Sequence, residues 1–128
     1  MSEREAAVAA HREEDASASE ALARRIAGIV EEKLGEEIVV LDMRELVSYT
    51  DFLILATARN ERLAKAIHDD VHAQLKTDGL LPGRAEGVQE SRWVLLDYVD
   101  CVLHVFVPDA RRHYRLEQLW GEAPHLKL

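Results

Sequence analysis

The amino-acid sequence predicts a single α/β domain in which a mixed β-sheet is flanked by helices. The chain has 128 residues, which is the usual size of one domain. Segments with apolar residues at helical spacing alternate with short, continuously apolar runs, which are typical of strands covered on both faces. The patterns indicate, in order, a helix, two strands, a helix, a hairpin and a last helix, an order that favours helices packed on a mixed sheet.

The first helix is predicted over residues 18–34. Ser17 and Glu20 fit a capping box at its start, and Gly35 is expected to be the left-handed residue that ends it. Residues 1–16 are rich in Ala and Glu but only weakly amphipathic, so we expect a flexible N-terminal extension. The apolar side chains that recur on one face of the helix are Leu22, Ile26, Ile29, Val30 and Leu34.

Two strands and a second helix follow. Residues 38–41 and 52–57 are short apolar runs and are predicted to be strands. The helix should begin after Asn60, a residue type that caps helix N-termini well, and end at Gly79. Its apolar residues recur every fourth position, at Leu63, Ile67, Val71 and Leu75.

Residues 80–90 contain proline and glycine and should form a loop, with or without a short edge strand. Residues 92–98 and 101–107 are predicted to pair as an antiparallel hairpin. Their turn, at Val99 and Asp100, lacks the Asn-Gly or Asp-Gly pair that two-residue hairpin loops prefer.

The last helix should open at Pro108, with Asp109 as its N-cap. We expect Gly121 to close it, which gives one domain over residues 17–121 and a C-terminal tail over residues 122–128. The side chains expected to face inward are those of Leu116, Leu119 and Trp120.

The chain is acidic, with a formal net charge of −8 at pH 7. This charge argues against broad binding to a nucleic-acid backbone, which needs an excess of Lys and Arg. Near RNA, such a protein is expected to bind a basic protein partner, although a charge of this size also commonly serves solubility. The single cysteine, Cys101, allows no internal disulfide and suits a reducing compartment. Without an apolar run long enough for a signal peptide or a membrane span, we expect a cytoplasmic protein.

Three carboxylates lie at the ends of predicted strands: Asp51, Asp97 and Asp100. Such groups can build a two-metal phosphoryl-transfer site, so a metal-dependent nucleotidyl or phosphoryl transferase is the alternative function. Turn capping through backbone hydrogen bonds is the favoured interpretation. The segment 57–60 that follows the second strand also has no glycine to bring the backbone close to a phosphate.

Two arrangements of histidines could supply metal ligands or a catalytic base. His68 and His72 share a helix face at the spacing of a zinc pair, but no third ligand is evident, and a solvated polar face is the simpler interpretation. Cys101 and His104 fall on opposite sides of one strand, which disfavours a Cys-His dyad. We therefore expect no catalytic residue, no metal and no cofactor.

The strand over residues 92–98 has two apolar faces. Trp93, Leu95, Asp97 and Val99 share one face, opposite the face that carries Val94, Leu96 and Tyr98. A sheet packed on helices needs only one apolar face, so a second one that carries a tryptophan and is edged by aspartate is a candidate docking surface. Helices on both faces are the other interpretation.

Three blocks of the sequence, in order from about residue 20 to 121, resemble the Iojap, or ribosome silencing factor, family. The first is Asp42, residues 50–57 (Thr-Asp-Phe-Leu-Ile-Leu-Ala-Thr), Arg62 and Val71, and the second is Gly79, Pro82, Glu86 and Gly87. The third is residues 93–97 (Trp-Val-Leu-Leu-Asp), Asp100, residues 104–106 (His-Val-Phe), Tyr114, Leu116, Glu117, Leu119 and Trp120. The sequence departs from the family pattern at three places. The family's usual Thr-Gly-x-Ser-x-Arg-His is replaced at residues 57–63 by Thr-Ala-Arg-Asn-Glu-Arg-Leu. Gly83 stands where the family often has Leu, and the turn at residues 99–100 lacks a glycine that is common in the family.

The resemblance implies a fold related to nucleotidyltransferases but without their catalytic residues. It implies binding to large-subunit ribosomal protein fourteen, which would exclude the small subunit and damp translation when nutrients are scarce. It also implies a possible homodimer, as in some members of the family. A membrane or sequence-specific nucleic-acid partner is not expected. In this interpretation Trp93 and Leu95 are the apolar anchor, and Asp97, Asp100 and Glu86 face Lys or Arg side chains of the partner.

Overall fold

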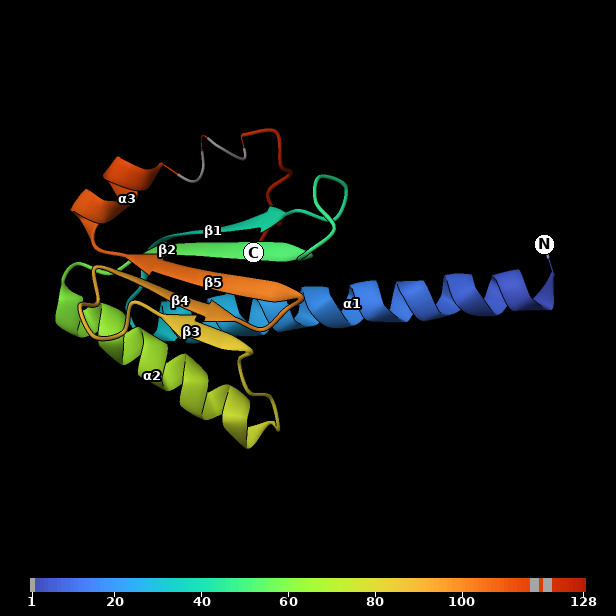
Figure 1. The fold of residues 1–128 in the computed structure, drawn as a ribbon, viewed down its shortest axis with the longest axis horizontal. Helices are drawn as coiled ribbons and strands as arrows, with labels where there is room; N and C mark the ends of the chain where they lie inside the picture. Colours follow the sequence, from blue (N-terminus) through green and yellow to red (C-terminus); the bar gives the residue numbers. More distant parts are fainter. Residues whose placement is uncertain (1, 116–117, 119–120) are drawn as a thin grey trace.

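The computed structural model describes residues 2–115, 118 and 121–128, and for residues 7–16 it describes the backbone alone. A five-stranded sheet is flanked by helices (Figure 1). This confirms the predicted α/β fold with a mixed sheet, whereas its relation to nucleotidyltransferases stays a prediction. The elements in chain order are α1 (Glu3–Glu32), β1 (Glu36–Asp42), β2 (Phe52–Thr57), α2 (Glu61–Thr77), β3 (Arg84–Glu86), β4 (Trp93–Asp97), β5 (Cys101–Phe106) and α3 (Pro108–Tyr114).

The strand order is β1-β2-β5-β4-β3. β2 pairs with β5 in parallel, and the other neighbouring strands pair antiparallel. Phe52 is paired with Cys101 at one end of the parallel pair and Thr57 with Phe106 at the other. The carboxyl ends of β2 and β5 therefore lie side by side, at the edge where α2 and α3 begin (Figure 1).

One face of the sheet packs against α1 and α2 (Figure 1). The strand residues that point toward these helices, such as Phe52 and Ile54 of β2, form one core with Ile26 of α1 and Ile67 of α2, and all four are 0% exposed. Burying a large apolar side chain contributes about 1.5–3 kcal/mol relative to leaving it in water. This core is therefore the main source of stability for the fold.

The other face is covered in part by α3, by the loop between β1 and β2, and by the C-terminal residues (Figure 1). Ala110 of α3, Met43 of the loop and Ala123 pack against it. A hydrogen bond of 2.7 Å from the Asp42 N–H to the Pro124 carbonyl fixes the C-terminal residues beside β1. Toward β4 and β3 this face remains partly exposed, which sets the place of the candidate site.

The helix α1 begins at Glu3, so the predicted start and capping box at Ser17 are wrong. The capping box is formed by Ser2 and Glu5 instead, with the Glu5 N–H donating to Ser2 Oγ at 3.2 Å and the Ser2 N–H to Glu5 Oε2 at 3.4 Å. Ala and Glu favour helix without any apolar face, and lengthening an existing helix needs no new nucleus. The flexibility of the N-terminal extension stays a prediction.

The other end of α1 also differs from expectation. Leu34 is the left-handed residue, with φ 70°, and Gly35 is not. The Gly35 N–H donates to the Val30 carbonyl at 2.8 Å, and a Cβ on Gly35 would lie only 2.4 Å from Val30 Cγ1. Glycine is needed here for space rather than for handedness.

The predicted limits of α2 are confirmed. Asn60 Oδ1 accepts a hydrogen bond of 2.8 Å from the Leu63 N–H, as an N-cap should. At the other end Gly79 has φ 86°, and the Leu80 N–H donates to the Leu75 carbonyl at 2.8 Å.

The hairpin of β4 and β5 is antiparallel, as predicted. In its turn Val99 adopts φ 73°, a conformation that usually favours glycine, and the Val99 N–H donates to Asp97 Oδ1 at 2.8 Å. The short edge strand in the preceding loop is β3, paired with β4.

In α3, the N-cap is Val107 and makes no side-chain hydrogen bond, so the prediction of Asp109 as N-cap is wrong. Pro108 occupies the first turn, where its missing N–H costs nothing. The helix ends before Arg115, which is left-handed with φ 48°, so the predicted end at Gly121 is wrong for α3. The residues predicted to face inward, Leu116, Leu119 and Trp120, lie outside the described residues. Among the helices that the structure describes, none is both long and apolar enough to cross a membrane.

Candidate docking site

The site is built on β4, whose side chains alternate between the two faces of the sheet. Val94 and Leu96 are buried in the core beneath α1 and α2, whereas Trp93, Leu95 and Asp97 on the other face are half-buried. In the described part of the chain, α1 and α2 thus seal one face of this strand, and the residues on the face that carries the tryptophan stay partly exposed.

We call this accessible surface the open sheet face. It surrounds a hollow of about 380 Å³. Cross-strand pairing explains its make-up, because directly paired residues point to the same side of a sheet. Leu95 is paired with His104 of β5 and with Glu86 of β3, and Asp97 with Arg84 of β3. The lining residues are Tyr49, Leu53, Arg84, Trp93, Leu95, Asp97, Val102 and His104.

The Trp93 side chain is held in one orientation by its neighbours. Its indole N–H donates to His104 Nδ1 at 2.9 Å. Its ring centroid lies 5.1 Å from that of Phe106 and 4.3 Å from that of Tyr114. The only polar atom of the ring is thus used inside the protein, and the surface that Trp93 offers to a partner is apolar.

His104 supports this arrangement as a neutral ring. It is 8% exposed, and burial lowers its pKa from 6.5 to about 4. Asp97 opposes this shift and Arg84 adds to it, but both effects are smaller than burial. Because Nδ1 accepts the indole N–H, the proton of the neutral ring is assigned to Nε2.

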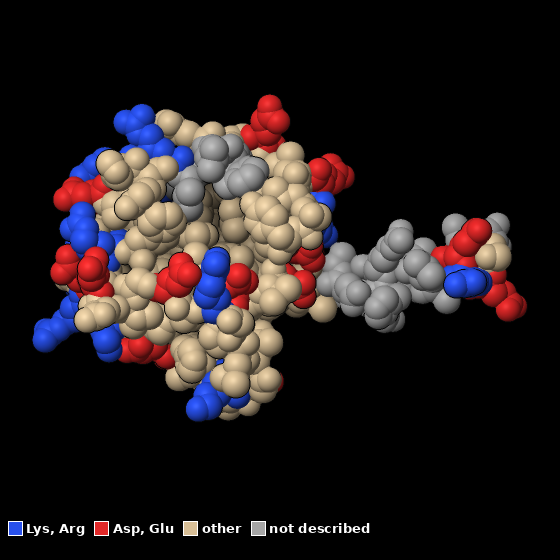
Figure 2. Space-filling view, in the orientation of Figure 1, with Lys and Arg blue, Asp and Glu red and all other residues tan. Residues whose placement is uncertain are grey.

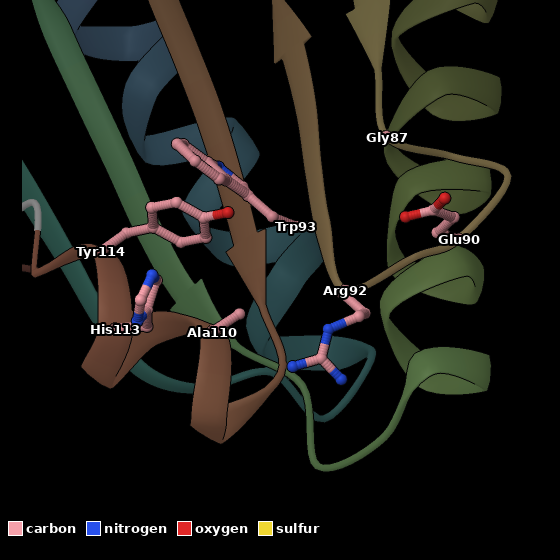
Figure 3. A pocket seen from close by; sticks show the side chains of 7 residues that line it. All are labelled: Gly87, Glu90, Arg92, Trp93, Ala110, His113 and Tyr114. Carbon is pink, nitrogen blue, oxygen red and sulfur yellow. The ribbon is translucent and has the colours of Figure 1, made fainter.

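Trp93 also lines a second hollow, of about 320 Å³. Figure 3 shows the Trp93 and Tyr114 rings against one another on one side of it, with His113 next to Tyr114, and Arg92 and Glu90 on the opposite side. Gly87 is required here because it has φ 76° and a Cβ would lie 1.9 Å from the Trp93 carbonyl oxygen. This glycine lets the loop pass against the start of β4.

The charged residues predicted for the site fall into two groups. Glu86 and Asp97 flank Arg84, whose Nε lies 3.5 Å from Glu86 Oε1 and whose Nη2 lies 4.0 Å from Asp97 Oδ2. Asp100 lies apart, in the hairpin turn, and its carbonyl accepts hydrogen bonds from the N–H groups of Asp51 and Phe52 at 2.9 and 3.0 Å. The structure therefore places Trp93, Leu95, Asp97 and Glu86 on one face and Asp100 beyond its end.

The carboxylates of the alternative transferase site do not form a metal-binding group. Across residues 2–115, 118 and 121–128, no three His, Cys, Asp or Glu side chains are placed to hold a metal ion. Asp97 caps the turn through the Val99 N–H, in line with turn capping. The proposed grouping of Asp51, Asp97 and Asp100 around metal ions is therefore wrong.

His68 and Cys101 are structural. His68 is 7% exposed, so the interpretation of His68 and His72 as a solvated polar face is wrong for His68. Helical spacing explains its burial: it lies four residues after Ala64 and three before Val71, beside the apolar stripe of α2. The Cys101 thiol points away from His104 and donates to the Ser19 carbonyl at 3.3 Å, and burial raises its pKa to about 12. The predicted separation of Cys101 and His104 is confirmed.

Sequence reasoning missed three side chains that shape the site: Tyr49, Arg84 and Tyr114. Tyr49 and Tyr114 are 65% and 50% exposed, which the sequence does not show, and the available signal was the place of Tyr114 in the third block that resembles the family. Arg84 could not be found this way, since its place depends on the pairing of β3 with β4.

The fold and the site together define a small α/β domain with a candidate docking surface. The family model described as "Ribosomal silencing factor during starvation" matches residues 15–128. The chain belongs to this ribosomal silencing factor family, which confirms the resemblance found in the sequence.

Individual relatives agree with this assignment. A ribosomal silencing factor of Halalkalibacterium halodurans is 36% identical over 99 residues, which are 77% of this chain and 85% of that protein. The chloroplastic protein Iojap of Arabidopsis thaliana is 32% identical over 117 residues, which are 90% of this chain and 48% of that protein. A crystal structure of a Chromobacterium violaceum protein superimposes with a TM-score of 0.74 at 35% identity, and covers 77% of this chain and 83% of that one.

Proposed function

We propose that this protein represses translation by docking through its open sheet face on large-subunit ribosomal protein fourteen, so that the small subunit is excluded. In this proposal it acts in the cytoplasm without enzymatic activity and damps translation when nutrients are limiting. The observation that carries the proposal is the half-buried Trp93, which is held rigidly on the open face of the sheet in a member of the ribosomal silencing factor family.

The apolar part of the site has the properties of a binding anchor. Trp93 is fixed by the hydrogen bond to His104 and by ring contacts with Phe106 and Tyr114, so little side-chain freedom remains to be lost on binding. Leu95 extends the apolar surface along β4. Truncating a central aromatic anchor typically costs about 2 kcal/mol or more of binding free energy.

The charged part of the site would guide a basic partner. Glu86 and Asp97 share a single cation, Arg84, so these three side chains carry an excess of negative charge. Pairs between exposed charges contribute modestly to affinity, and their main effect is on encounter rate and orientation. Asp100, at the hairpin turn, would contribute at the rim of the contact.

Co-sedimentation with purified large ribosomal subunits tests the proposal. We expect the wild-type protein to pellet with large subunits and Trp93→Ala to remain in the supernatant, because the anchor is lost. Since Trp93 is also part of the fold, Glu86→Lys provides a second test on an exposed side chain. It should weaken co-sedimentation, most strongly at low salt.

A matched control for the charge reversal is Glu31→Lys on α1, which is exposed and lies outside the open sheet face. The proposal requires that Glu31→Lys pellets like wild type. Folded Trp93→Ala and Glu86→Lys variants that both pellet like wild type would refute it. Adding the protein before the small subunit, and measuring the fraction of joined ribosomes, then tests the exclusion step.

A further inference from the structure

The acidic chain carries a cationic region at one end of its sheet. Two neighbouring hollows, of about 480 and 340 Å³, share Pro108 as a lining residue. In the described part of the chain they are lined by five arginines, Arg59, Arg92, Arg111, Arg112 and Arg115, and by three carboxylates. Five positive and three negative charges give this lining a formal charge of +2, whereas the whole chain carries −8.

We call this region the arginine end. Figure 2 shows Lys and Arg side chains along the edge of the molecule where α3 lies and α2 begins, interspersed with a few carboxylates. It coincides with the carboxyl ends of the parallel strands β2 and β5, since Thr57, the last residue of β2, lines the larger hollow. In open α/β sheets this is the usual place for a ligand.

Arg111 is built into the structure of the arginine end. It is 9% exposed, and its Nη1 donates to the Glu37 carbonyl at 2.7 Å and to Thr57 Oγ1 at 2.8 Å. Glu37 lies in an irregularity of the β1–β2 pairing with φ 48°. These bonds hold a guanidinium in the wall of the hollow.

The outer arginines of α3 are exposed and can reach a ligand. Arg112 pairs with Asp109, but the two side chains are 72% and 76% exposed, so this pair is weak and can be exchanged. Arg115 Nε donates to the Arg112 carbonyl at 3.1 Å, which holds the Arg115 side chain at the end of α3, and both Arg112 and Arg115 line the larger hollow. Guanidinium groups present forked donors that match phosphate oxygens.

We propose that the arginine end binds phosphate groups of RNA. For its partner this inference rests on the proposed function, since a ribosomal particle offers RNA beside protein. RNA fits better than a free nucleotide because the cations are spread over two hollows along an edge, and the turn after β2, at residues 57–60, has no glycine to cradle a single phosphate. The acidic remainder of the chain does not prevent this, because charges beyond about 10 Å are largely screened at 0.1 M salt.

Fluorescence anisotropy of a labelled single-stranded RNA, titrated with the full chain over a range of salt concentrations, tests the inference. The variant Arg112→Gln/Arg115→Gln should bind about tenfold more weakly at low salt, and the slope of log Kd against log salt should become shallower by about 1.4, or about 0.7 for each lost contact. Asp109→Asn, which removes the carboxylate beside Arg112, should bind about two- to fivefold more tightly. The matched control Arg4→Gln/Lys76→Gln removes the same charge from exposed positions at the start of α1 and the end of α2, which line neither hollow, and should bind like wild type.

Three results would overturn the inference. The first is that the wild-type chain does not bind the RNA, and the second is that the control variant loses as much RNA affinity as the Arg112→Gln/Arg115→Gln variant. The third is that polyglutamate or ATP, added at the same total anionic charge as the RNA, displaces the labelled RNA. Each is independent of the proposed function, which is scored by co-sedimentation of Trp93→Ala. A Trp93→Ala chain that binds RNA normally but no longer pellets with large subunits would support both proposals.

Discussion

The hydrogen bond between Trp93 and His104 predicts a specific dependence of stability on pH. His104 titrates with a pKa of about 4 in the folded protein, against 6.5 as its ordinary value. Between these two values the unfolded chain binds a proton that the folded protein does not, so stability falls as pH decreases from about 6.5 to about 4. One pKa unit corresponds to 1.36 kcal/mol, so the loss assigned to this histidine is about 3 kcal/mol.

A variant isolates this contribution from the titration of the carboxylates. In His104→Gln the side-chain carbonyl can still accept the indole N–H of Trp93, but nothing titrates at that position. Urea unfolding of both proteins between pH 7 and pH 4 should give a free energy of unfolding that decreases by about 3 kcal/mol more in wild type than in the variant. If the free energies of unfolding of the two proteins changed in parallel with pH, His104 would not be held neutral by burial. The role of neutral His104 as the hydrogen-bond acceptor for Trp93 would then be refuted.

Two further predictions concern the loop before β4 and the thiol beneath the sheet. Gly87→Ala should lower the free energy of unfolding by at least about 2 kcal/mol, because Gly87 has φ 76° and the new Cβ would collide with the Trp93 carbonyl oxygen. A thermal melt measures this loss. A melting temperature equal to that of wild type would contradict the prediction. Cys101 is 0% exposed and its pKa is raised to about 12, so a thiol reagent should label the native protein only as fast as it unfolds and label it rapidly in urea. Rapid labelling under native conditions would contradict the burial of this thiol.

Elements with a strong period were predicted correctly because local physics determines them. Leu63, Ile67, Val71 and Leu75 could form one buried stripe only in a helix, and Asn60 and Gly79 fixed its limits. The N-terminus of α1 was misplaced for the converse reason: this part of the helix has little amphipathic pattern, so the apolar periodicity that located the other helices gave no signal there.

The site could be predicted in part. The alternation of β4 separated Trp93 from Val94 without knowledge of the fold, because the period of a strand is two. The face that helices would cover, and the partners of Trp93, depend on pairing across the sheet. Phe106 is paired with Trp93 in the register of β4 and β5, and Tyr114 comes from α3, so neither contact follows from sequence spacing.

The position of α3 joins the two proposed surfaces. Its Tyr114 packs against Trp93 beside the open sheet face, while Arg111 and Arg112 line the arginine end. A short helix thus borders a surface that is apolar with acidic edges and a surface that is cationic. A ribosomal partner that presents a basic protein next to exposed RNA would match both at once, and contacts on two sides of one helix would fix the orientation of the domain more tightly than either contact alone. Such a fixed orientation is what steric exclusion requires, because a domain that rotates about a single tryptophan could swing out of the path of the incoming subunit.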